Sequence, residues 1–98
     1  MSRPVVFQPA ARLDVISAQD WHGRAAIGLG ARFRQELGFQ VVRIADNPLQ
    51  FPLRLKDIRS AKLRRFPYSL FFRATEADVA IIACFHASRD PTVWRGRA

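Results

Sequence analysis

The chain has 98 residues, of which 49% are hydrophobic, and it carries a formal net charge of +8 at pH 7. This length suffices for one domain with a single core, so we expect residues 1–98 to form one packed domain rather than a disordered chain. Its apolar runs are too short for a signal peptide or a membrane span, and the lone Cys84 excludes a disulfide framework, so we expect a cytoplasmic protein that does not enter membranes.

The first half of the chain predicts a strand followed by a helix. Pro4–Gln8 is a short run typical of a strand, and Pro9 follows it as a residue that is tolerated at the first position of a helix. Glycines between residues 23 and 30 indicate that this helix ends near residues 24–28. A partial apolar stripe on the helix consists of Leu13, Ile16, Ala18 and Trp21.

A second helix with a clearer apolar stripe is predicted next. Its apolar residues are spaced by four, four, four and three positions, as one face of a helix requires. Asn47 and Pro48 end the helix, because the residue before a proline disfavours helical dihedral angles. The stripe consists of Leu29, Phe33, Leu37, Val41 and Ile44.

The second half of the chain predicts an antiparallel sheet. Leu49–Leu55 is a proline-punctuated connector, with the beginning of a strand as the alternative. It leads to Ile58–Phe66, which alternates in polarity and has a basic outer face, as a half-exposed strand does. Tyr68–Arg73 and Val79–Phe85 are apolar enough to be middle strands, and a short polar turn joins them. One strand, two helices and three strands predict an α+β fold with the helix pair packed on one face of a small antiparallel sheet.

Basic residues are concentrated in the second half of the chain. Residues 54–98 carry ten basic and four acidic side chains, a net charge of +6, whereas residues 1–53 carry a net charge of +2. Most of the cations are arginine, whose planar, forked guanidinium suits phosphate and carboxylate groups. We therefore expect a polyanionic target or an acidic protein partner, the alternative being a basic surface without a target.

A cluster of polar and aromatic side chains follows the last apolar strand. The sheet would deliver His86, Arg89 and Trp94 to one end of the molecule, where a partner or a reaction could be held. The alternative for His86 is a structural role at the strand end. Trp94 either covers the sheet or anchors a partner, and the tail Trp94–Ala98 is expected to be frayed.

No pattern in the sequence predicts a metal or a cofactor. His22 and His86 are far apart, and neither a cysteine pair nor a carboxylate cluster accompanies them. Gly28 and Gly30 lack the third glycine and the preceding strand of a dinucleotide-binding loop. We expect neither a metal nor a cofactor.

Several short motifs occur together in one order along the chain. They are Phe7-x-Pro9-x-Ala11-x-x-Asp14-x-x-x-Ala18, Gly28-Leu29-Gly30-x-x-Phe33, Ile44-x-x-x-Pro48, Arg59, Arg65-Phe66-Pro67-Tyr68 and His86-x-x-Arg89-Asp90-Pro91-x-x-Trp94-x-x-Arg97. Taken together, they resemble the RelE/ParE superfamily of bacterial toxins from type II toxin–antitoxin modules, and the ParE-like branch most of all.

The resemblance implies a small toxin that forms a hetero-oligomer with a cognate antitoxin, whose acidic, partly disordered tail keeps it silent. Inhibition of DNA gyrase by binding is typical of ParE-like members, and ribosome-dependent cleavage of mRNA is typical of RelE-like members. A third alternative is a protein that keeps the fold without toxicity. The fold alone does not choose between these activities.

Each alternative has its own candidate residues. A nuclease would use Arg65, His86 and Arg89, because guanidinium groups stabilise the phosphate and an imidazole can act as acid or base. The antitoxin is expected to lie across the helix pair and the sheet edge, and its candidate contacts are Leu13, Trp21, Phe33 and Leu37. The candidate contacts to a cellular target are Arg59, Arg64, Arg65, Arg73, Arg89, Trp94, Arg95 and Arg97.

Overall fold

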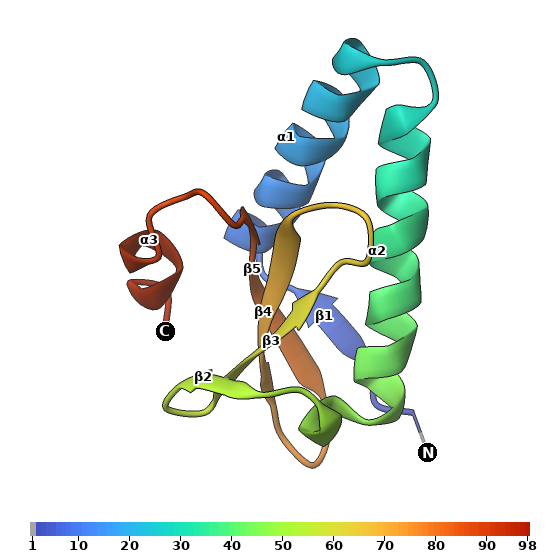
Figure 1. Cartoon of the computed structure of the whole chain (residues 1–98). Coiled ribbons are helices and arrows are strands. Elements are labelled where there is room, and N and C mark those ends of the chain that lie inside the picture. The colour runs from blue at the N-terminus through green and yellow to red at the C-terminus, as the bar shows by residue number, and fades with distance from the viewer. Residues whose placement is uncertain (1) are drawn as a thin grey trace.

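The computed structural model describes residues 2–98 and confirms the α+β fold (Figure 1). The elements in chain order are β1 (Val5–Phe7), α1 (Pro9–Ala25), α2 (Leu29–Asp46), the 3₁₀ turn η1 (Pro48–Gln50), β2 (Leu53–Leu55), β3 (Ile58–Lys62), β4 (Tyr68–Ala74), β5 (Val79–His86) and α3 (Thr92–Arg95). The strands form a 5-stranded sheet in the order β1-β5-β4-β3-β2. The sheet is mixed rather than fully antiparallel, because β1 runs parallel to β5.

The helices α1 and α2 form an antiparallel pair that packs on one face of the sheet (Figure 1). Gly28 makes the turn between them with φ of 79°, a left-handed conformation that glycine adopts without strain. Gly30 allows the helices to approach closely, since a Cβ at this position would lie 2.9 Å from the carbonyl oxygen of Gln19. None of the helices in residues 2–98 is long and apolar enough to cross a membrane.

The two helices differ in how well their buried faces could be predicted. The stripe on α2 is the predicted one, with Phe33, Leu37 and Ile44 buried in the core. The stripe predicted for α1 is wrong for its large members, because Leu13, Ile16 and Trp21 are 65%, 47% and 61% exposed. The small side chains on the other face let α1 lie close to the sheet, and the buried residues of α1 are Ala11, Val15, Ala18 and His22.

The strands β4 and β5 form the centre of the sheet, as their apolar sequences predict, and β5 contains a β-bulge. Phe72 of β4 pairs with Ile81 of β5, whereas the preceding Phe71 pairs with Ala83. Ile82 is therefore an extra residue in β5. After the extra residue the alternation along β5 is shifted by one, so the backbone N–H and C=O groups of every second residue point to the opposite edge of the strand from the one the pattern before the bulge would give.

The second face of the sheet is covered by α3. The indole of Trp94 is 5% exposed and stacks on Phe71 with ring centroids 4.1 Å apart. The backbone N–H of Thr92 donates to the carboxylate of Asp90 at 2.9 Å, and this hydrogen bond holds the pKa of Asp90 below its ordinary value. The expectation of a frayed tail is wrong, because the packing of Trp94 holds the segment against the sheet.

Strand boundaries differ from the prediction mainly around β3. The strand expected over Ile58–Phe66 ends at Lys62, and residues 63–67 form a loop. The connector over residues 49–55 contains the short edge strand β2, which pairs antiparallel with β3. β2 and β3 place Arg54 and Arg59 on the part of the sheet farthest from β1.

Candidate functional site

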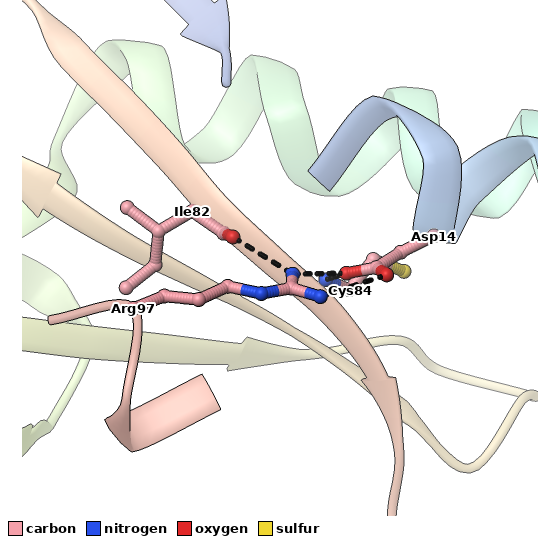
Figure 2. A network of polar contacts seen from close by, with 4 residues as sticks. All are labelled: Asp14, Ile82, Cys84 and Arg97. Atoms are coloured by element: carbon pink, nitrogen blue, oxygen red, sulfur yellow. Dashed lines mark hydrogen bonds and ion pairs between the residues drawn. The ribbon is translucent and has the colours of Figure 1, made fainter. Parts of the chain in front are cut away.

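The outer edge of β5 is only partly covered by another strand. β1 pairs with the first residues of β5, and its last pair ends before the bulge. Beyond the bulge, the backbone N–H of Cys84 donates to the carboxylate of Asp14 on α1 at 3.1 Å. The carbonyl oxygen of Ile82 accepts a hydrogen bond from the guanidinium of Arg97 at 3.1 Å (Figure 2). The side chains of Asp14 and Arg97 thus make the hydrogen bonds to β5 that the backbone of a neighbouring strand would otherwise make.

Asp14 and Arg97 also form an ion pair with each other. Nη1 of Arg97 lies 2.6 Å from Oδ2 of Asp14, and Nη2 lies 3.3 Å from Oδ1 (Figure 2). The side chains are 10% and 24% exposed for Asp14 and Arg97, respectively, so water screens the pair only in part. A forked pair of this kind is among the stronger polar contacts in proteins. It fastens the C-terminal segment to α1.

Cys84 lies beneath this pair and is structurally buried. Burial raises the pKa of its thiol to about 12, and the negative charge of Asp14 acts in the same direction. The thiol is therefore protonated at neutral pH and is a poor nucleophile.

A cleft of about 260 Å³ lies between α1 and the open edge of β5. Leu13, Ser17 and Trp21 follow one another at intervals of four residues along the α1 wall, and Cys84 and His86 lie on the β5 wall. We call this hollow the α1–β5 cleft. It brings together Leu13 and Trp21, two of the residues expected to contact an antitoxin, and both are largely exposed.

The other two candidate antitoxin contacts do not lie on the surface. Phe33 and Leu37 are 0% and 3% exposed, because the stripe of α2 to which they belong faces the core. Leu37 reaches only the floor of a separate groove of about 460 Å³ between the helices, where Arg12 and Arg34 also line the walls. We call it the α1–α2 groove.

A cleft of about 440 Å³ is lined by the end of β5, by β2 and by α3. Its basic side chains are Arg54, Arg89 and Arg95, and we call it the basic cleft. The guanidinium of Arg89 lies 4.3 Å from the ring centroid of Phe85, a cation–π contact that orients it. Within residues 2–98, ion pairs are formed by Arg73 and Arg97. The guanidinium groups of Arg54, Arg89 and Arg95 are therefore not neutralised by a carboxylate of the described residues.

Four of the expected target contacts are engaged within the fold. Arg59 donates to the carbonyl oxygen of Phe51 at 2.7 Å, and Arg73 pairs with Asp57 at 2.8 Å. Arg97 pairs with Asp14, and Trp94 is buried against the sheet. Of the others, Arg89 and Arg95 meet in the basic cleft, while Arg64 and Arg65 are exposed on the loop after β3. Sequence reasoning missed Arg54, which no motif singles out.

The three candidate nuclease residues are not assembled into one site. His86 and Arg89 line the same clefts, whereas Arg65 lines none of them, and its backbone N–H donates to Glu36 of α2 at 3.1 Å. The Nδ1 atom of His86 accepts a hydrogen bond from the backbone N–H of Ser88 at 3.0 Å. This contact closes the turn after β5, which is the structural role considered for His86.

Comparisons with known proteins agree with this architecture. A family model described as "ParE toxin of type II toxin-antitoxin system, parDE" matches residues 5–91. Among solved structures, a chain of the "Chromosomal ParDE TA system from P. aeruginosa" is similar with a TM-score of 0.72 and 21% sequence identity. The match covers 87% of this chain and 96% of that chain, and at this identity it supports the fold. No curated protein matches the chain.

Proposed function

Because the chain belongs to the ParE toxin family of type II toxin–antitoxin systems, we propose that a cognate antitoxin neutralises it and that it acts in the cytoplasm by binding DNA gyrase. The observation that carries this proposal is the pairing of two surfaces on one small chain. One is the apolar α1–β5 cleft, and the other is the basic cleft on the opposite face of the sheet. Each has the chemistry that one of the two partners requires.

The α1–β5 cleft supports the binding of an antitoxin. Exposed, clustered apolar side chains on a monomer usually mark an interaction site, and Leu13 and Trp21 are such residues on the α1 wall of this cleft. Arg89 lines the same cleft, where it would meet acidic side chains. A disordered segment with acidic and apolar residues matches that arrangement.

The basic cleft supports the binding of a negatively charged target surface. Its three arginines project from β2, from the loop after β5 and from α3, so a partner must contact three separate segments at once. Arginine at such a position forms forked hydrogen bonds with carboxylates and phosphates. Gyrase is the target typical of this branch of the family, and the cleft is the surface on which we place it.

The direct test is a supercoiling assay with purified gyrase and purified protein. We expect supercoiling to fall as the protein concentration rises and to recover when the antitoxin encoded by the neighbouring reading frame is added. Unchanged supercoiling at a large molar excess of the protein would contradict gyrase binding.

The alternative activity, cleavage of mRNA, is favoured by one observation. His86 and Arg89 lie together in the basic cleft, where an imidazole and a guanidinium could both reach a phosphodiester. Primer extension on cellular mRNA after induction separates the two activities, because new cleavage ends would favour the nuclease. Normal growth on strong induction without antitoxin would instead indicate a chain that has lost toxicity.

A further inference from the structure

A cluster of aromatic rings encloses the imidazole of His22 near the end of α1. His22 is only 6% exposed, and its ring centroid lies between 5.0 and 5.5 Å from the centroids of four other rings. Phe33 stacks on the imidazole, and the other three rings approach it edge-on. The four rings are those of Trp21, Phe33, Phe66 and Tyr68. A polar side chain in such surroundings needs hydrogen-bond partners for its nitrogens.

Only one of the two ring nitrogens of His22 has a partner in the fold. Nδ1 lies 2.7 Å from the carbonyl oxygen of Ala18, one turn earlier in α1. A carbonyl oxygen only accepts, so Nδ1 carries the proton of this hydrogen bond and Nε2 of the neutral ring is an acceptor. Nε2 has no hydrogen-bond partner within residues 2–98. Because the described residues leave no fully buried side-chain nitrogen unpaired, the small exposed part of His22 includes Nε2.

The imidazole is exposed to a cleft of about 460 Å³, which we call the His22 cleft. It lies between the last turns of α1, the loop before β4 and the turn after β5. The loop and the turn meet at one end of the sheet, where the N–H of Ala87 donates to the carbonyl of Pro67 at 2.7 Å (Figure 1). His22, Pro67 and Ser88 line none of the clefts described above, whereas the remaining lining residues also border the α1–β5 cleft.

The walls of the His22 cleft define the chemistry of a ligand. Trp21 is exposed, and together with Pro67 and Tyr68 it offers flat apolar surfaces on which a planar ring can stack. Arg89 forms no ion pair within residues 2–98, and none of the described carboxylates lines the cleft, so an anion is favoured there. Nε2 of His22 requires a donor, such as an amino group. A planar base, an amino group and a phosphate occur together in a nucleotide.

We propose that the His22 cleft binds one nucleoside monophosphate unit whose base carries an amino group. The base stacks on Trp21, its amino group donates to Nε2 of His22, and the phosphate contacts the guanidinium of Arg89. The unit belongs either to a free nucleotide or to a nucleic-acid strand, since both present the same groups. This site is separate from the proposed binding of gyrase and of an antitoxin, and it depends on neither.

Calorimetric titration of the full chain with adenosine 5′-monophosphate tests the site. Purine riboside 5′-monophosphate differs from it only in lacking the amino group, and we expect it to bind about tenfold more weakly, because Nε2 of His22 then stays unpaired. His22→Phe keeps a ring in the aromatic cluster and removes both nitrogens, so it should weaken binding of adenosine 5′-monophosphate by a similar factor. The control is Arg54→Gln, which removes a charge from the basic cleft and should bind as the wild type does.

NMR of the imidazole nitrogens provides a readout that does not depend on the variants, since the chain has only two histidines. We expect the Nε2 signal of His22 to shift when adenosine 5′-monophosphate is added, while Nδ1 stays protonated. Tighter binding of a short oligodeoxyadenylate would identify a strand as the source of the unit, and tighter binding of the monophosphate would identify a free nucleotide.

Three results would overturn the inference. One is the absence of binding by both probes, and another is equal affinity for the two monophosphates with an unmoved Nε2 signal of His22. The third is a loss of affinity in Arg54→Gln as large as that in His22→Phe, which would place the phosphate in the basic cleft instead.

Discussion

The guanidinium of Arg97 lies 2.6 Å from the carboxylate of Asp14, and this contact fastens the end of the chain to its first helix. Each partner also satisfies a backbone group on the open edge of β5. The pair therefore has two structural tasks: it closes the fold around α3, and it covers polar backbone that no strand covers. The stability of the protein should depend on it more than on an ordinary surface ion pair.

We expect Arg97→Ala to lower the free energy of unfolding by about 2 kcal/mol, because it leaves the shielded carboxylate of Asp14 and the carbonyl of Ile82 without their donor. Urea denaturation measures the change. The matched control is Arg73→Ala, whose partner Asp57 is exposed, and it should cost less than about 1 kcal/mol. Equal losses for the two variants would contradict the role assigned to Arg97.

We expect Trp94→Ala to lower the free energy of unfolding by about 3 kcal/mol, because it removes a buried aromatic side chain and uncovers Phe71. Thermal melting followed by circular dichroism measures the loss. Trp21→Ala deletes the same side chain from an exposed position and should leave the melting temperature nearly unchanged. A melting temperature for Trp94→Ala close to that of the wild type would mean that α3 does not hold the sheet face.

Stability should decrease at alkaline pH. The folded-state pKa of Cys84 is raised to about 12 from its ordinary value of 9.0, mainly by burial, and burial also raises the pKa of Tyr68. The unfolded chain therefore loses these protons before the folded chain does, so the stabilising contribution is complete below about pH 9 and disappears as the pH rises toward 12. Melting temperatures measured between pH 8 and 11 should fall more steeply for the wild type than for Cys84→Ala. Parallel curves for the two proteins would refute the assignment to Cys84.

We expect Leu13→Asp and Trp21→Ala to weaken antitoxin binding at least about tenfold, because each removes an apolar contact from the α1–β5 cleft. Both side chains are exposed, so the fold should be preserved. Cells that produce either variant should no longer be rescued by the antitoxin. Leu49→Ser is the control, since Leu49 is an exposed apolar residue on η1 that does not line this cleft. Equal rescue of all three variants would place the antitoxin elsewhere.

Charge reversal in the basic cleft should reduce gyrase inhibition. We expect the combined change Arg54→Glu and Arg95→Glu to raise the concentration needed for half-inhibition of supercoiling at least about tenfold, because it opposes a negatively charged surface at two points. Arg32→Glu changes the charge at an exposed position on α2 and should have little effect. If the two proteins inhibited equally, the target would bind outside the basic cleft.

The sequence predicted those elements in which large side chains carry the pattern. Phe33, Leu37 and Ile44 mark the buried face of α2, because their spacing places three large apolar side chains on one face of the helix. On α1 the same rule failed, because the residues that touch the sheet are mostly small and the large ones remain outside. A helix that also exposes large apolar side chains shows two apolar faces, and the sequence does not tell which of them is covered.

Features that depend on contacts between distant residues were not predictable. Tyr68–Arg73 and Val79–Phe85 were found because they are continuously apolar, but that same continuity hides the bulge at Ile82. The contact between Asp14 and Arg97 joins residues 83 positions apart and has no periodic signal. The basic cleft likewise depends on Arg54, which only the pairing of β2 with β3 brings into place.

The two tryptophans occupy opposite environments, Trp94 stacked on Phe71 inside the protein and Trp21 facing water on α1. The fluorescence emission maximum of the enclosed Trp94 should therefore lie at a shorter wavelength than that of the solvated Trp21. Replacing either by phenylalanine leaves the other as the only tryptophan, which reports on the arrival of a partner at Trp21 or on the loss of packing between α3 and the sheet at Trp94. The order of these two events could then be followed in time without attaching any label.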